Sequence, residues 1–93
     1  MSLADTIALI SGLLEDAERA CGTYADDPAN WHRRHRAEMA ELPARIAQAG
    51  IGCVLTERGD LTRFRCAGFA ASSTGGMARA IHNWLDRARD KVA

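Results

Sequence analysis

The sequence predicts an α+β domain in which helices cover an antiparallel β-hairpin, in the order α-α-β-β-α. Apolar residues recur every three or four positions in three segments, residues 2–24, 28–50 and 77–92, as amphipathic helices require. Residues 51–57 and 61–69 are instead short runs rich in β-branched and aromatic residues. With 93 residues, of which 47% are hydrophobic and 26% charged, the chain suffices for a single globular domain spanning residues 1–93.

The first helix has clear boundaries in the sequence. Ser2 and Asp5 lie three residues apart and resemble a capping box, in which side chains satisfy the free N–H groups of the first turn. Gly22 is expected to end the helix, because glycine readily adopts the left-handed conformation found there. The apolar stripe between them contains Leu3, Ile7, Ile10, Leu14, Ala17, Cys21 and Tyr24.

The second helix is expected to begin with Asp27 as its cap and Pro28 at its first position, and to end at Gly50. Pro43 lies inside it, lacks an N–H group and clashes with the preceding turn. We therefore expect a kink, or a break into two pieces, near Leu42. The apolar stripe of this helix contains Trp31, His35, Met39, Leu42, Ile46 and Ala49.

A two-residue turn at Gly59-Asp60 would pair the two β segments as a hairpin. In that register Leu55 faces Phe64, and Cys53 faces Cys66. A turn centred one residue earlier would pair Cys53 with Phe64 instead, so two registers remain open. In the first register the residues alternate as a sheet with one buried face requires. The buried face then carries Cys53, Leu55, Phe64 and Cys66, and the exposed face carries Thr56, Arg63 and Arg65.

Residues 70–76, with the sequence AASSTGG, are predicted to form a small polar loop before the last helix. Ser73 or Thr74 can cap that helix. Its buried face is expected to contain Met77, Ile81, Trp84, Leu85, Ala88 and Val92. Its exposed face is expected to contain Arg79, Asn83, Asp86, Arg87 and Asp90.

Charge is distributed unevenly along a chain whose formal net charge is zero. Residues 1–30 carry six acidic side chains and one arginine, whereas residues 31–93 carry eleven basic and six acidic side chains. Either the two parts attract each other within the fold, or they form an acidic and a basic face that a partner can recognise.

The segment WHRRHR, residues 31–36, concentrates the residues most often found in binding sites. His32 and His35 share a helix face, but a zinc site would need further ligands, and no spacing connects them to His82 or to the cysteines. We therefore predict no metal site and no cofactor. Arginines at this density could instead neutralise nucleic-acid phosphates. Neutral net charge, a pairing of Arg34 with Glu38 and the absence of a recognition motif argue for a solvated helix face.

No grouping typical of catalysis is present. The loop SSTGG before the last helix could bind an anion, but it lacks the lysine of a phosphate-binding loop. The predicted hairpin turns Cys53 and Cys66 inward, where they would fill core space, and it brings their sulfur atoms near enough that pairing stays open. No Ser-His-Asp grouping or carboxylate pair is visible, so we predict a protein that is not an enzyme.

Cysteine usage and hydropathy indicate where the chain resides. Three cysteines cannot all pair, none form a CxxC motif, and no export signal precedes them. No apolar run approaches the length of about 18 residues that a membrane helix needs. We therefore expect a cytoplasmic protein that does not enter a membrane.

Two segments resemble known families. Residues 63–88, RFRCAGFAASSTGGMARAIHNWLDRA, resemble small phage-encoded accessory proteins, some of which are anti-CRISPR inhibitors. That resemblance implies a compact α/β protein without a catalytic site that blocks a larger nucleoprotein machine by binding it. LPARIAQAGIG, residues 42–52, followed by a helix ending in Trp84-Leu85, is similar to the helical small subunit of type III CRISPR effector complexes, from which the predicted hairpin departs.

We therefore expect a small binding protein that docks onto a larger protein or nucleoprotein complex as an inhibitor or regulator. The alternative is direct nucleic-acid binding through an arginine-rich helix and hairpin face. A homodimer through the hairpin edge is a further expectation, because unpaired strand edges recruit other strands. The candidate contact residues are Arg33, Arg34, Arg36, Arg63, Arg65, Asp16 and Glu18.

Overall fold

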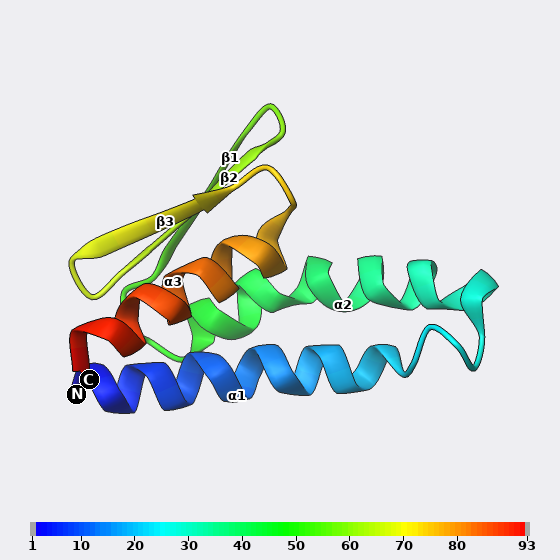
Figure 1. Cartoon of the computed structure of the whole chain (residues 1–93), viewed down its shortest axis with the longest axis horizontal. Coiled ribbons are helices and arrows are strands. Elements are labelled where there is room, and N and C mark those ends of the chain that lie inside the picture. The colour runs from blue at the N-terminus through cyan, green and yellow to red at the C-terminus, as the bar shows by residue number, and fades with distance from the viewer. Residues whose placement is uncertain (1, 93) are drawn as a thin grey trace.

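The computed structural model describes residues 2–92, which form an α+β fold of three helices and one antiparallel sheet (Figure 1). The sheet has the strand order β1-β2-β3. This confirms the predicted fold class and adds one strand to it. The elements are α1 (Leu3–Cys21), α2 (Pro28–Gln48), β1 (Val54–Arg58), β2 (Leu61–Cys66), β3 (Phe69–Ser73) and α3 (Met77–Val92).

The predicted boundaries of the first two helices are largely confirmed. The Ser2 hydroxyl accepts the Asp5 N–H at 3.1 Å, and the Asp5 carboxylate accepts the Ser2 N–H at 3.4 Å, which completes the capping box. α1 ends at Cys21, and Gly22 follows it with a φ of 71°. Asp27 caps α2 by accepting the Asn30 N–H.

α2 runs without interruption through Pro43, so the expected break into two pieces near Leu42 was wrong, whereas a kink there stays a prediction. A proline inside a helix costs about 3 kcal/mol. Leu42 and Ile46 flank Pro43 and are both buried. Burying two such side chains stabilises the fold by about 1.5–3 kcal/mol each, which offsets that cost.

The hairpin formed by β1 and β2 has the first of the two registers considered. Leu55 pairs with Phe64, Thr56 with Arg63, and Arg58 with Leu61 across the Gly59-Asp60 turn. Phe64 and Cys66 are buried, whereas Arg63 and Arg65 are exposed, so the predicted alternation is confirmed. One face of the sheet is therefore available to solvent or to a partner.

The prediction of a polar loop over residues 70–76 was wrong, because residues 69–73 form the third strand. β3 pairs antiparallel with β2, with Cys66 opposite Phe69 and Phe64 opposite Ala71. A two-residue Ala67-Gly68 turn joins the strands, and both of its residues have positive φ, as tight hairpins require. The usual turn signals, Asn-Gly and Asp-Gly, are absent here. Small residues also give β3 little strand propensity of its own.

α3 covers the inner face of β2 and β3, and α1 packs against α3 and α2 on the side away from the sheet (Figure 1). Trp84 of α3 is fully buried, and its indole N–H donates to the Cys66 carbonyl at 3.2 Å. Its ring stacks on Phe69 at 5.0 Å between centroids and meets Phe64 edge-on at 5.6 Å. The core continues through Ile10, Leu14, Ala17, Met39, Leu42, Ile46, Ala71, Ala80, Ile81, Leu85 and Ala88.

Three predictions at element ends were wrong. Tyr24 and Val92, placed on buried stripes, are 55% and 49% exposed, because Tyr24 lies beyond the end of α1 and Val92 is the last residue of α3. The cap of α3 also differs. Ser73 lies in β3, where its hydroxyl accepts the Gly75 N–H, and Thr74 precedes Met77 by three residues. Gly76, whose carbonyl accepts the Ala80 N–H at 3.1 Å, occupies the cap position.

A matched pair of substitutions tests the third strand. Ala71→Glu should lower the free energy of unfolding by about 3 kcal/mol or more, because Ala71 is buried against the core and the glutamate would be an unpaired buried charge. Ser72→Glu, one residue along and exposed, should change it by less than about 0.5 kcal/mol. Urea unfolding measures both. If the two substitutions changed the free energy of unfolding equally, the strand over residues 69–73 would be contradicted and a loop would be favoured.

Candidate interaction surfaces

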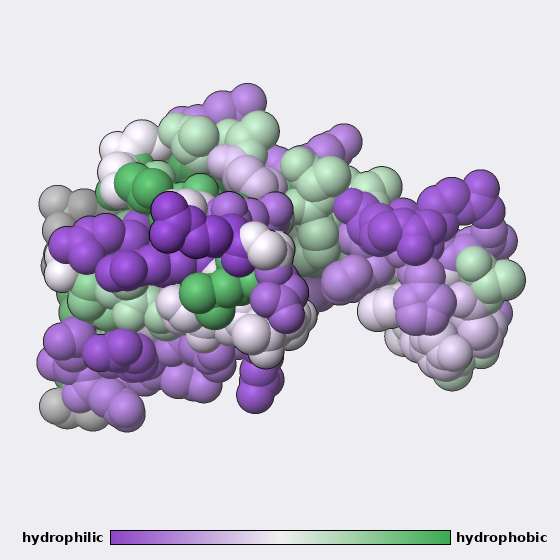
Figure 2. Space-filling model, turned by 90° about the horizontal axis from the view of Figure 1, so that it is seen from above, coloured by the Kyte–Doolittle hydropathy of each residue, from purple (hydrophilic) through white to green (hydrophobic). Residues whose placement is uncertain are grey.

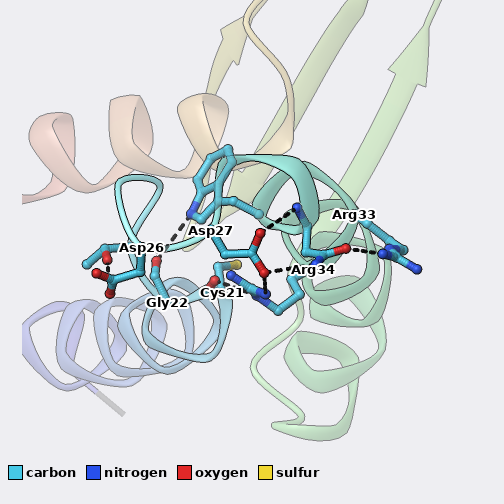
Figure 3. Close-up of polar contacts among 9 residues, drawn as sticks. Cys21, Gly22, Asp26, Asp27, Arg33 and Arg34 are labelled. Carbon is cyan, nitrogen blue, oxygen red and sulfur yellow. Dashed lines mark hydrogen bonds and ion pairs between the residues drawn. The ribbon is translucent and has the colours of Figure 1, made fainter.

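The WHRRHR segment closes the turn between α1 and α2 (Figure 3). The Trp31 indole N–H donates to the Gly22 carbonyl at 3.2 Å, and the Arg34 Nε donates to the Cys21 carbonyl at 2.9 Å. Arg34 also pairs with the Asp27 carboxylate at 3.6 Å. A guanidinium at the last carbonyl of α1 complements the partial negative charge at that helix end. Arg34 is therefore held by the fold, and its predicted pairing with Glu38 was wrong.

Other charged side chains of α2 also contact side chains of the same helix. Arg45 contacts Glu38 at 3.0 Å and Glu41 at 2.6 Å, and the second contact joins residues four positions apart on the helix. Arg33 donates to the side chain of Asn30. Arg36 is exposed and lines a shallow hollow beside Met39, where the tip of β1 and the start of α3 approach α2.

The carboxyl of Asp27 is held in its charged form. Its pKa is lowered chiefly by the hydrogen bond from the Asn30 side chain, with smaller contributions from the Asn30 N–H and from Arg34. The Asn30 amide and the Asp27 carboxylate are 2.8 Å apart. A charged cap at the start of α2 also complements the positive end of that helix.

Aromatic rings gather at the end of the α1–α2 hairpin that projects past the sheet, seen as a separate lobe in Figure 2. Trp31 stacks on His35 with 4.7 Å between centroids, and Tyr24 and His32 meet Trp31 edge-on at 5.7 and 5.2 Å. Trp31 and His35 are only half-buried, so they pack with this cluster outside the main core. Over residues 2–92, no three His, Cys, Asp or Glu side chains come together as metal ligands.

The open face of the sheet carries a group of three arginines. Arg58, Arg63 and Arg65 line a hollow of about 390 Å³ together with Val54, Thr56 and Leu61. No acidic side chain lines this hollow, and none of the three guanidinium groups forms an ion pair within the described residues. Seen from above, this side of the molecule shows hydrophilic residues beside apolar ones (Figure 2).

Two of these three arginines were candidates from the sequence, and Arg58 was missed. The confirmed register pairs Arg58 with Leu61, which places it on the same face as Thr56 and Arg63. The alternation of β1 was therefore the signal that could have found it. Arg33 and Arg36 belong to α2, whereas Arg63 and Arg65 lie on the exposed face of β2, opposite the face that α3 covers, so the two pairs lie on different elements.

The acidic candidates lie on α1, on the opposite side of α3 from the sheet (Figure 1). Asp16 pairs with Arg19 at 3.2 Å, and both side chains are largely exposed. Glu18 contacts His82 of α3 at 2.9 Å. Together with the Asp27–Arg34 pair, this contact joins the acidic first third of the chain to the remainder. The attraction expected between the two parts of the chain therefore occurs at these two contacts, whereas an acidic and a basic face for a partner stay a prediction.

The two sheet edges differ in exposure. The outward carbonyls of β3 accept side chains from α3: Asn83 donates to Ser72 at 3.1 Å and Arg87 donates to Ala70 at 3.1 Å. β1 forms the other edge, and within residues 2–92 no strand pairs with its outer side. The edge of β1 is therefore the one that can accept another strand.

Cys53 and Cys66 lie close together, with 2.6 Å between their sulfur atoms. Cys66 is buried, whereas Cys53 is half-buried beside an apolar hollow of about 290 Å³. Burial and the neighbouring Cys66 raise the pKa of the Cys53 thiol, and burial raises that of Cys21. Raised pKa values keep these thiols mostly protonated at neutral pH, so their attack as thiolates is slow.

Comparisons of the chain with protein-family models, with curated proteins and with solved structures found no match. No helix within residues 2–92 has both the length and the apolar character needed to cross a membrane.

Replacing Arg34 separates the structural arginine from its neighbours. Arg34→Ala should lower the free energy of unfolding by about 1 kcal/mol, because the Cys21 carbonyl and Asp27 both lose their partner in a half-exposed setting. Arg33→Ala and Arg36→Ala should each change it by less than about 0.5 kcal/mol. Chemical denaturation measures all three. Equal effects of the three substitutions would show that Arg34 does not hold the turn.

Proposed function

We propose that this protein is a non-enzymatic docking module and that the open sheet face is its contact surface. The observation that carries the proposal is the group formed by Arg58, Arg63 and Arg65, which form no ion pair within residues 2–92 and lie beside exposed apolar residues. Val54 is 55% exposed and Leu61 is 42% exposed. The partner that fits this chemistry is an acidic surface with apolar residues, on a larger protein or a nucleoprotein complex.

The combination of side chains supports a protein partner. Arginine is enriched among the residues that contribute most to binding at protein interfaces, and its planar guanidinium binds carboxylates in bidentate geometry. Val54 and Leu61, at the two ends of this face, would add apolar burial to such a contact. The acidic residues of α1 lie on the far side of the molecule, so they would not oppose the approach of an acidic partner to the sheet.

The finer proposal is that docking inhibits or regulates a nucleoprotein complex in the cytoplasm. Its support is the resemblance of residues 63–88 to small phage-encoded inhibitors, an anti-CRISPR-like mode of action. In the structure that segment comprises most of β2, all of β3 and most of α3. It therefore includes Arg63 and Arg65 of the proposed contact surface.

A second candidate function is direct nucleic-acid binding by the same face. Arg63 and Arg65 are two residues apart on one strand, a separation of about 6.6 Å along the chain, and both point outward. Guanidinium groups in such a row can contact successive phosphates of one strand. Of the four arginines first considered for this role, the sheet pair is favoured, because Arg33 and Arg36 lie on α2.

Charge reversal on two surfaces tests the docking proposal. Arg63→Glu with Arg65→Glu should weaken partner capture at least about tenfold, because both guanidinium groups face the proposed contact. Arg33→Glu with Arg36→Glu changes the net charge equally on α2 and should retain capture. The full chain serves as bait in lysate of the cell that encodes it, with and without nuclease. Both variants should melt near the temperature of the wild type.

The outcome also separates the two candidate functions. Capture that survives nuclease and is lost only in the sheet variant supports an acidic protein partner. Binding to DNA or RNA that falls steeply between about 50 and 200 mM salt, with no nuclease-resistant partner, favours the second function. Equal capture by both variants would exclude the sheet face as the contact surface.

We also propose that the edge of β1 pairs two copies of the chain, joining their sheets. At high concentration the wild type should sediment with twice the monomer mass of 10.1 kDa. Thr56→Lys should shift it to monomer, because lysine on an edge strand blocks strand addition. Ser72→Lys places the same charge on the covered β3 edge and should leave the dimer intact. A monomer mass for the wild type at the highest concentration would remove this proposal.

A further inference from the structure

The two cysteines at the base of the β1–β2 hairpin form a site that the docking proposal does not use. Cys66 ends β2, and Cys53 directly precedes β1. Val54 pairs with Arg65, so the same register continued by one residue places Cys53 opposite Cys66. Their sulfur atoms are 2.6 Å apart, and Cys66 is additionally 4.0 Å from the Ile51 carbonyl.

We propose that Cys53 and Cys66 are a dithiol site that a low-molecular-weight disulfide, such as oxidised glutathione, converts to an intramolecular disulfide. Residues opposite each other on antiparallel strands have Cα separations of about 4.5–5.5 Å, which lie within the range that a disulfide spans. The bond therefore requires no displacement of β1 relative to β2.

Because the two thiols differ in exposure, Cys53 reacts first and Cys66 second. Cys53 adjoins the apolar hollow lined by Pro43, Ile46 and Ala47, so a small reagent reaches it first. Cys66 is 2% exposed and is reached only through its neighbour. The small thiolate fraction of Cys53 attacks one sulfur of the reagent disulfide and releases the first reagent thiol, so the exchange is slow and is measured at equilibrium. Cys66 then attacks the Cys53 sulfur of the mixed disulfide and releases the second.

This exchange conserves bonds, electrons and protons. The sulfur–sulfur bond of the reagent breaks, and one forms between Cys53 and Cys66. The two cysteines are oxidised, the reagent is reduced to two thiols, and the protons of the two protein thiols end on the released reagent. Cys21 takes no part, because it is buried in α1 and its thiol donates to the Ala17 carbonyl at 3.2 Å.

The bond would act on the least supported strand of the sheet. β1 packs mainly against β2, whereas β2 and β3 also pack against α3. A link between Cys53 and Cys66 closes the loop that contains β1, the Gly59-Asp60 turn and β2. Closing that loop restricts the unfolded chain and holds β1 in place.

Redox titration of the full chain tests the site. The protein is equilibrated with mixtures of oxidised and reduced glutathione, trapped by alkylation and analysed by mass spectrometry. Before alkylation, we expect the oxidised chain to be lighter than the reduced chain by two hydrogen atoms. After alkylation, Cys53 should be linked to Cys66 and only Cys21 should carry the alkyl group. The oxidised form should melt at least about 5 °C higher than the reduced form.

Variants distinguish the site from general thiol chemistry. Cys53→Ala leaves the buried Cys66 in place and should remove the response of the melting temperature to glutathione, whereas Cys21→Ala should respond like the wild type. A stable glutathione adduct, a disulfide between chains, or two free thiols at the most oxidising ratio would each overturn the proposal. Partner capture measured under reducing conditions tests the docking proposal separately, so either can fail without the other.

Discussion

Trp84 lies between α3 and the sheet, stacked on Phe69, edge-on to Phe64 and hydrogen-bonded to the Cys66 carbonyl. The indole N–H would be a buried donor without a partner if β2 ended elsewhere, which costs about 1–3 kcal/mol. This contact fixes which face of the sheet is buried. Because strand residues alternate between faces, it also fixes that Arg63 and Arg65 point away from the core. The exposed arginine face is thus a consequence of the core.

Local signals in the sequence were sufficient for much of the fold. The capping box at Ser2, the Asp27-Pro28 start of α2 and the Gly59-Asp60 turn each act within four residues, and each was predicted. β3 was missed because nothing local specifies it. Its residues are small, its turn lacks the usual pair, and it exists because β2 offers a second edge and α3 covers Ala71.

The candidate surface residues also divide into those that local periodicity could predict and those that depend on long-range packing. Arg63 and Arg65 were predicted to be exposed because a period of two follows from the strand itself. The role of Arg34 depends on the return of α2 alongside α1, which brings it to the Cys21 carbonyl thirteen residues earlier. Helical periodicity could indicate that Arg34 and Arg33 point in different directions. It could not indicate that one of them meets the end of another helix.

Across the sheet, the strand with the most stabilising contacts, β3, is the least available to a partner, and the strand with the fewest, β1, is the most available. β3 is held by β2, by Ala71 packed on the core, and by Asn83 and Arg87, whose side chains bond its outward carbonyls. β1 has β2 alone on one side and an apolar hollow beneath it. The same strand carries the unpaired edge and Arg58, and the cysteine pair adjoins its start. A strand held so weakly can open locally at little cost in free energy. Contacts with a partner, with a second copy or through a covalent link would therefore all act on β1, where the fold itself supplies the least support.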